Sequence, residues 1–120
     1  MAQRNMAPRL RRVIVESPFA GDIDANIRYA REAVRDCVLR GEAPIASHLL
    51  FTQPGILRDE IAGERAMGID AGHAWLTVAE AVVVYNDRGI SKGMQLGIDR
   101  AHFMGVAVEY RSLYAEKADL

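Results

Sequence analysis

The residues Ser91 to Met94 have the types and spacing that best suit ligand chemistry in this sequence. They follow the apolar run 81–85 and a polar, glycine-bearing loop that ends at Ile90. A strand, such a loop and a helix that begins at a serine together direct free backbone N–H groups beyond the edge of a sheet. Groups of this kind bind phosphate or another polar nucleotide group. The segment therefore predicts a ligand site at the start of a helix.

Other polar or aromatic side chains follow the other predicted strands. Phe19, in a loop after the first strand, suits either a plug at the end of the core or a surface on which a nucleobase stacks. His48, after the second strand, is better placed as a hydrogen-bonding pocket residue than as a base, because the sequence shows no nucleophile beside it. Arg65 fits a solvated charge or a lid arginine that reaches a ligand phosphate. The predicted ligand-binding residues are Ser17, Pro18, Phe19, Asn26, Ser47, His48, Arg65, Asp87, Ile90, Ser91, Gly93 and Met94.

Strand and helix patterns alternate along the chain. Branched apolar runs predict strands, and apolar residues at helical spacing predict helices. Pro44 places the second strand near a sheet edge, Gly41 stops the first helix, and 49–59 is a loop or a short helical turn. The predicted strands are 12–16, 43–47, 81–85 and 106–110, and the predicted helices are 24–40, 60–76 and 91–104.

This order predicts an α/β fold, with parallel βαβ units and right-handed crossovers. We expect a small doubly wound sheet of the Rossmann or flavodoxin type, with about four to five strands and helices on both faces. The single domain spans 12–113, between a flexible basic arm (1–11) and a C-terminal tail (114–120). The carboxyl ends of parallel strands meet at one edge, so the loops after the four strands share one crevice.

Charge and composition restrict the partners. The 120 residues include 15 basic and 16 acidic side chains, for a formal net charge of −1, which gives no general attraction to nucleic acid or membrane. The N-terminal arginines are interpreted as a solvated terminus, with contact to a polyanion as the alternative. No apolar run approaches a transmembrane length, and the first twelve residues lack a signal-peptide core, so we expect a cytoplasmic protein.

The sequence predicts neither a metal site nor a cofactor. No pair of histidines, and no histidine with an acid or a cysteine, has the spacing of metal ligands. The single cysteine, Cys37, is interpreted as a small buried hydrophobe. Trp75 lies on an apolar stripe and is assigned to the core or to a subunit interface.

Two segments carry a resemblance to a known family. Ser17-Pro18-Phe19-Ala20-Gly21 and the loop and helix from Ile90 to Ala101 resemble the nucleoside 2-deoxyribosyltransferase-like superfamily, in particular small phage and bacterial proteins grouped with it. The resemblance covers about residues 12 to 113. It implies a doubly wound sheet that binds a nucleoside or nucleotide over the strand ends. It also implies a homo-oligomer with shared pockets.

The same resemblance implies that a catalytic glutamate is missing. In the superfamily a glutamate on this helix attacks the anomeric carbon, and its position falls on Gly97. Asp87 and Asp24 remain as carboxylates that could reach the pocket, with Asp87 as the candidate catalytic residue. We therefore expect a protein that binds a nucleoside- or nucleotide-derived molecule without turnover.

Three functions stay open at this point. One form of the binder is a phage protein that sequesters a nucleotide immune signal of its host. The alternative is an N-glycosidase or deoxyribosyltransferase-like enzyme that uses Asp87 or another carboxylate. A structural assembly protein with a vestigial pocket is the third.

Overall fold

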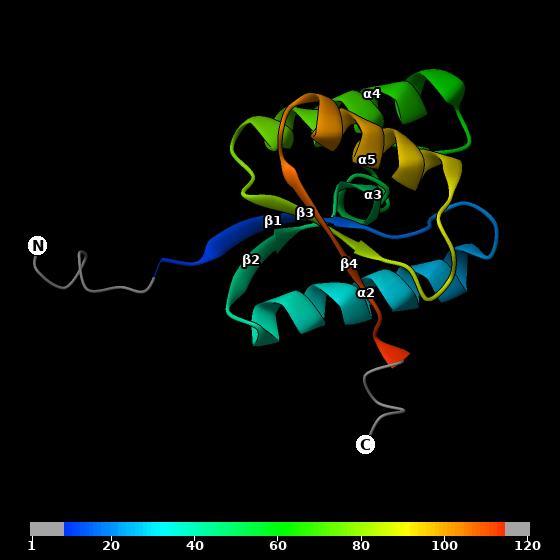
Figure 1. Cartoon of the computed structure of the whole chain (residues 1–120). Coiled ribbons are helices and arrows are strands. Elements are labelled where there is room, and N and C mark those ends of the chain that lie inside the picture. The colour runs from blue at the N-terminus through cyan, green and yellow to red at the C-terminus, as the bar shows by residue number, and fades with distance from the viewer. Residues whose placement is uncertain (1–8, 115–120) are drawn as a thin grey trace, which may run out of the picture.

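A four-stranded parallel sheet in the order β2-β1-β3-β4 forms the centre of the protein (Figure 1). The structure, a computed structural model, describes residues 9–114. The strands are β1 (Arg11–Glu16), β2 (Glu42–Ile45), β3 (Ala81–Tyr85) and β4 (Ala107–Arg111). The helices are α2 (Ile23–Leu39), α3 (Ser47–Leu50), α4 (Ala62–Ala74), the 3-10 helix η1 (Trp75–Thr77) and α5 (Lys92–Phe103).

The predicted α/β fold with a parallel sheet is confirmed. β2, which contains Pro44, lies at a sheet edge as predicted. The predicted segment 49–59 is mostly loop, although the short helix α3 begins before it, at Ser47. Most of the predicted basic arm and C-terminal tail, residues 1–8 and 115–120, lies outside the described residues.

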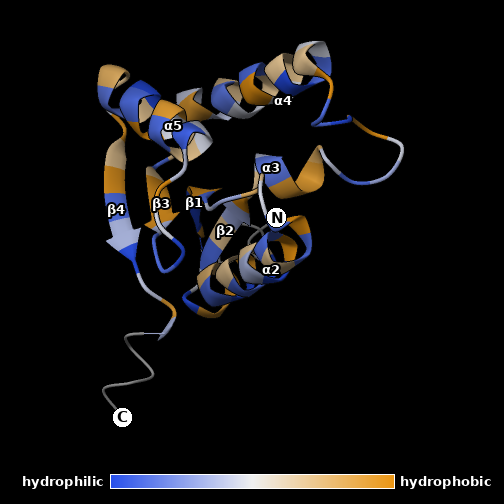
Figure 2. Cartoon of the chain, turned by 90° about the vertical axis from the view of Figure 1, so that its right-hand side faces the viewer, coloured by the Kyte–Doolittle hydropathy of each residue, from blue (hydrophilic) through white to orange (hydrophobic). Residues whose placement is uncertain are grey.

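Alternate residues of the central strands enter two separate cores. Val83 and Tyr85 of β3 pack in one core with residues of α2, whereas Val82 and Val84 pack in the other with residues of α5. All five residues of β3 are buried, because a strand in the middle of a parallel sheet has no solvated face. Figure 1 shows α2 on one side of the sheet and α4 and α5 on the other, and Figure 2 shows hydrophobic β3 between α5 and α2.

The ends of α2 follow from single residues. The Asp22 carboxylate accepts a hydrogen bond from the Ala25 N–H at 3.2 Å and caps the first turn. Gly41, predicted to stop the helix, has a φ of +81°, a left-handed conformation that glycine adopts without strain. Cys37 lies on the inner face of this helix and is fully buried, as predicted.

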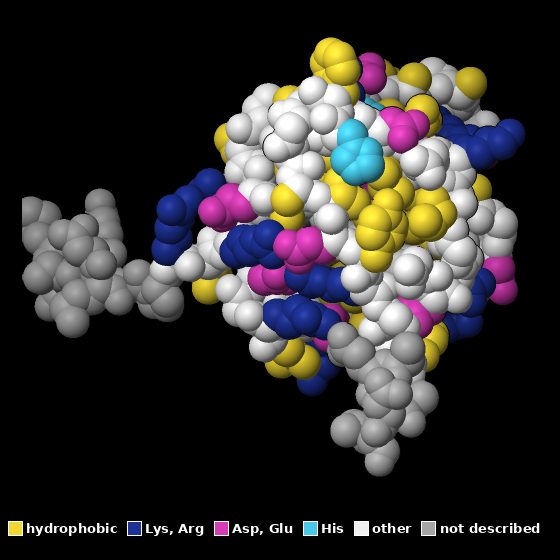
Figure 3. Space-filling view, in the orientation of Figure 1, with side chains coloured by type: hydrophobic (Ala, Val, Ile, Leu, Met, Phe, Trp, Pro, Cys, Tyr) yellow, Lys and Arg dark blue, Asp and Glu magenta, His cyan; other side chains and the backbone are white. Residues whose placement is uncertain are grey.

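A buried ion pair joins the two edge strands. Arg111 of β4 donates two hydrogen bonds to the Glu42 carboxylate of β2, at 2.8 Å and 2.7 Å. Both side chains are more than nine-tenths buried, and the hydrogen bond from Arg111 lowers the pKa of Glu42. Glu109 and Arg11 extend the pair toward the surface. Figure 3 shows basic and acidic side chains interleaved on the face where β4 lies in front.

Two other parts of the sequence interpretation concern exposure. Trp75 is 47% exposed, so it is not a core residue, and its assignment to a subunit interface stays a prediction. Within residues 9–114, no helix is long and apolar enough to cross a membrane.

A glycine of α4 lets α3 approach closely. A Cβ at Gly72 would lie 2.9 Å from the Cβ of Ser47, well inside van der Waals contact. A Cβ at Gly63, near the start of the same helix, would meet nothing within 4 Å. The contact at Gly72 positions Ser47 and the adjoining His48 at the end of β2.

We expect Gly72→Ala and Gly63→Ala to change stability in opposite directions. The first should lower the free energy of unfolding by about 1 to 3 kcal/mol, because the added methyl group overlaps Ser47. The second should raise it by up to about 1 kcal/mol, because alanine loses less backbone entropy in a helix. Urea denaturation measures both changes. A loss of stability of equal size in both variants would contradict the close approach of α3 to α4.

Candidate functional site

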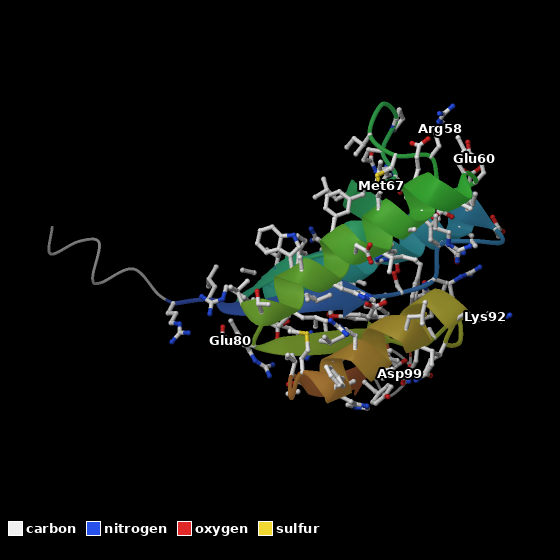
Figure 4. All side chains as sticks on the ribbon, turned by 90° about the horizontal axis from the view of Figure 1, so that it is seen from above. Arg58, Glu60, Met67, Glu80, Lys92 and Asp99 are labelled. Atoms are coloured by element: carbon white, nitrogen blue, oxygen red, sulfur yellow. The ribbon has the colours of Figure 1, made fainter. Side chains whose placement is uncertain are left out.

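A pocket of about 320 Å³ lies over the carboxyl ends of β1 and β2, beside the first turn of α5. Figure 4 shows Lys92, at the start of α5, at the same end of the molecule as Arg58 and Glu60, which precede α4, whereas Glu80 lies at the opposite end. The residues that line the pocket are Glu16, Ser17, Phe19, Ala20, Ser47, His48, Asp59, Arg65, Ile69, His73, Ser91, Lys92, Gly93 and Met94.

The structure brings together most of the residues predicted to bind a ligand. Those that line the pocket are Ser17, Phe19, Ser47, His48, Arg65, Ser91, Gly93 and Met94. Pro18 is buried and Ile90 is exposed, and neither residue lines the pocket. Asn26 and Asp87 also lie outside the lining, and both hold other parts of the structure in place.

Ser17 and His48 form a hydrogen-bonded pair at the base of the pocket. The Ser17 Oγ and the His48 Nε2 are 2.6 Å apart. Burial lowers the pKa of His48 to about 4, so the imidazole is neutral at pH 7. A neutral imidazole and a hydroxyl offer donors and acceptors without net charge. This agrees with the interpretation of His48 as a hydrogen-bonding pocket residue.

The first turn of α5 presents free N–H groups to the pocket. Ser91 caps the helix, and its Oγ accepts a hydrogen bond from the Met94 N–H at 3.2 Å. Within the described residues, no hydrogen-bond acceptor is paired with the backbone N–H groups of Lys92 and Gly93. A Cβ at Gly93 would meet only the Ser91 Oγ, 4.0 Å away, so space remains beside this backbone. The turn is therefore open to a bound anion.

Asn26 shapes the loop that carries Phe19. Its side-chain amide donates hydrogen bonds to the carbonyl oxygens of Phe19 and Ala20, at 3.0 Å and 3.1 Å. Its oxygen accepts a hydrogen bond from Arg88 Nε at 2.8 Å. Asn26 is buried, so it positions Phe19 at the pocket without lining the pocket itself.

Asp87 anchors the segment after β4. Its carboxylate accepts hydrogen bonds from the Tyr29 and Ser112 hydroxyls at 2.6 Å, and from the backbone N–H groups of Leu113 and Tyr114. Desolvation opposes ionisation, but the hydrogen bonds outweigh it and lower the pKa of Asp87 to about 2. Catalysis by this carboxylate would require these bonds to break. The geometry gives Asp87 a structural role away from the pocket.

Glu16, the last residue of β1, is a pocket residue that the sequence analysis missed. It lines the pocket, and burial raises the pKa of its carboxyl group to about 8. Among the described residues, no hydrogen bond or ion pair reaches this carboxyl group. Because side chains alternate along a strand, Glu16 lies on the same face of the sheet as Ile14, which belongs to the core beneath α5. This alternation was the signal in the sequence that could have identified Glu16 as a site residue.

Gly97 of α5 leaves the space that the Glu16 carboxyl group fills. A Cβ at Gly97 would overlap the Glu16 carboxylate and lie 2.7 Å from its Cδ. Gly97 is the position at which the resemblance implies a catalytic glutamate. A carboxyl group therefore lies beside this position after all, although it comes from β1.

The α4 side of the pocket adds charged and ring side chains. Arg65 is 4.0 Å from Asp59 and exposes about half of its side chain. Desolvation and the charge of Arg100 lower the pKa of His73. Ile69 and His73 were not predicted, because a helix face turned toward a pocket has no distinct sequence pattern. Asp59, in the loop before α4, was not predicted either, whereas Lys92 lies within the predicted segment from Ser91 to Met94. Within residues 9–114, no group of three or more His, Cys, Asp or Glu side chains is placed to hold a metal ion.

We expect Glu16→Gln to stabilise the protein, and more so at higher pH. The folded pKa of about 8 exceeds the unfolded value of 4.5, so stability falls as pH rises from 4.5 to 8. The full loss is on the order of 5 kcal/mol, and glutamine removes it. Urea denaturation of both proteins from about pH 5 to pH 9 measures the difference.

Glu80→Gln is the control for this measurement. A hydrogen bond from the Arg12 N–H lowers the pKa of Glu80, so its ionised form stabilises the folded state above pH 4.5. Its removal should lower stability at pH 7, opposite in sign to the effect of Glu16→Gln. A difference between wild type and Glu16→Gln that stays constant with pH would show that Glu16 is not desolvated.

Comparison with known proteins gives a family. No curated protein matches the sequence. Residues 11–111, from the start of β1 to the end of β4, match the family described as Domain of unknown function (DUF7768). The match spans the whole sheet and every residue that lines the pocket. The chain therefore belongs to the DUF7768 family.

Proposed function

We propose that the pocket binds a small molecule derived from a nucleoside or a nucleotide. The observation that supports this most is the combination of an open helix N-terminus with an aromatic side chain in one pocket at the strand ends. In open parallel sheets, ligands bind at this edge, beside the helix that follows a central strand. The volume of about 320 Å³ is at the lower end of the roughly 300 to 1,000 Å³ typical of small-molecule sites.

The first turn of α5 is the proposed phosphate subsite. The unpaired N–H groups of Lys92 and Gly93 and the positive end of the helix dipole favour an anion there. The Lys92 side chain and Arg65, from the opposite side of the pocket, add two cations. Arg65 would then be the lid arginine of the sequence analysis.

The remaining lining suits the rest of a nucleoside. Phe19, Ile69 and Met94 provide apolar surface for a base, and Ser47 and His48 provide hydrogen bonds for polar ring atoms or sugar hydroxyls. Sequestration of a nucleotide signal is one biological form of such binding. A homo-oligomer, with the exposed Trp75 at its interface, is part of the same proposal.

A second candidate function is base release by an enzyme. It is favoured by the Glu16 carboxyl group, which fills the space beside Gly97. A neutral carboxyl group can protonate a departing base, and an ionised one can attack the anomeric carbon. Glu16 lines the pocket, whereas Asp87 does not, so Glu16 replaces Asp87 as the carboxylate in this alternative.

A panel of nucleosides and nucleotides tests both functions. We expect the wild-type protein to bind a phosphate-bearing member in calorimetry, and chromatography after hours of incubation to recover it unchanged. Gly93→Asp should weaken binding at least tenfold through charge repulsion at the phosphate, whereas Gly93→Asn, of nearly equal size, should weaken it less. The open space at Gly93 allows both variants to fold.

The other outcomes separate the alternatives. Release of free base by the wild type, lost in Glu16→Gln and kept in Asp87→Asn, would replace the binder with the enzyme. Equal affinity in Gly93→Asp and Gly93→Asn would contradict the phosphate subsite. Absence of binding to every member of the panel would overturn the proposed function.

A further inference from the structure

Glu16 faces the proposed phosphate subsite without a partner. Its carboxyl group contacts α5 at Gly97, four residues and hence about 6 Å along the helix from Gly93. It lines the same pocket as Lys92 and Gly93. Within the described residues, no arginine or lysine side chain forms an ion pair with the Glu16 carboxyl group. The pocket therefore contains a partly buried carboxyl group that has no hydrogen-bond or ion-pair partner among the described residues.

The charge of this carboxyl group decides whether an anion fits. An ionised Glu16 would repel a phosphate bound at the first turn of α5, in the same pocket. A neutral carboxyl group instead offers an O–H donor that can bond a phosphate oxygen. Desolvation already favours the neutral form, and it raises the pKa of Glu16 to about 8.

We propose that binding of the ligand's anionic group is coupled to protonation of Glu16, whose neutral carboxyl group donates a hydrogen bond to a phosphate oxygen. This inference rests on the proposed function and names the chemistry of its anion subsite. Glu16 is then a specificity-determining residue that accepts an anion only while it carries its proton. Binding should raise the affinity of Glu16 for that proton, because linkage is reciprocal.

Other ionisable groups face Glu16 across the pocket. The ring of His48 comes from the segment after β2, and Lys92 begins α5. The α4 side of the pocket contributes Asp59, from the loop before the helix, together with Arg65 and His73. Burial lowers the pKa of His48 to about 4, and desolvation lowers that of His73, so both rings are neutral above pH 7. The comparison of wild type with Glu16→Gln isolates the contribution of Glu16 to the pH dependence of binding.

The test uses inorganic phosphate as the probe. Calorimetry gives the phosphate dissociation constant of the full chain at several values between about pH 7 and pH 9.5, and amide NMR shifts of Lys92 and Gly93 near pH 7 locate the bound phosphate. Wild-type affinity should change little below the pKa of Glu16 and fall about tenfold per pH unit above it. Glu16→Gln keeps a neutral hydrogen-bond donor and should bind phosphate with nearly constant affinity across this range. Asp59→Asn, which neutralises the other carboxylate of the pocket, should keep the wild-type pH dependence.

Several results would overturn the inference. Wild-type affinity that does not fall above pH 8, or an equal fall in Glu16→Gln, would show that the proton of Glu16 is not linked to the anion. Phosphate shifts that spare Lys92 and Gly93 would place the anion elsewhere. If a nucleotide from the panel binds and its affinity is independent of pH, this inference fails while the proposed function stands. If neither nucleotides nor phosphate bind, both fail.

Discussion

The absence of a side chain at Gly97 is the constraint on which the candidate site depends. A Cβ there would overlap the Glu16 carboxyl group, so Glu16 keeps its position in the structure only while residue 97 has no side chain. Because Glu16 fills the space beside Gly97, a partly buried carboxyl group lies at the pocket, and desolvation raises its pKa to about 8. A carboxyl group that costs folding free energy at neutral pH and has no hydrogen-bond or ion-pair partner among the described residues supports the proposal that a ligand binds beside it.

The rest of the structure holds this site rigid from outside. Asp87 fixes the segment after β4, and the pair of Arg111 and Glu42 connects the two edge strands across the face under α2. Asn26 holds the loop that carries Phe19. These charged and polar groups are saturated by protein partners, whereas Glu16 and the first N–H groups of α5 are not. Within the described residues, the unsaturated groups thus gather at the end of the sheet where parallel folds bind ligands.

The sequence predicted the fold better than it predicted the site. Buried strands such as 81–85 and the periodic helix α2 are local patterns, and Gly41 and Pro44 act through their own backbones, so all of these were predictable. The Ser91 motif was also local. Asp87 was misjudged because its partners are distant in sequence, at Tyr29 and after β4. Glu16 was missed because its meaning depends on Gly97, eighty-one residues away, and only the packing of β1 against α5 joins the two.

The protonation state of Glu16 is the central claim, and a carbon-13 NMR titration of its carboxyl carbon measures it directly. Our account predicts a midpoint near 8 for the protein alone, and a higher midpoint when phosphate or a nucleotide is bound. Glu60, an exposed carboxylate before α4, provides a reference resonance in the same spectra. A Glu16 midpoint at the ordinary value of 4.5 would show that the carboxyl group is solvated and ionised at neutral pH, and would contradict the account.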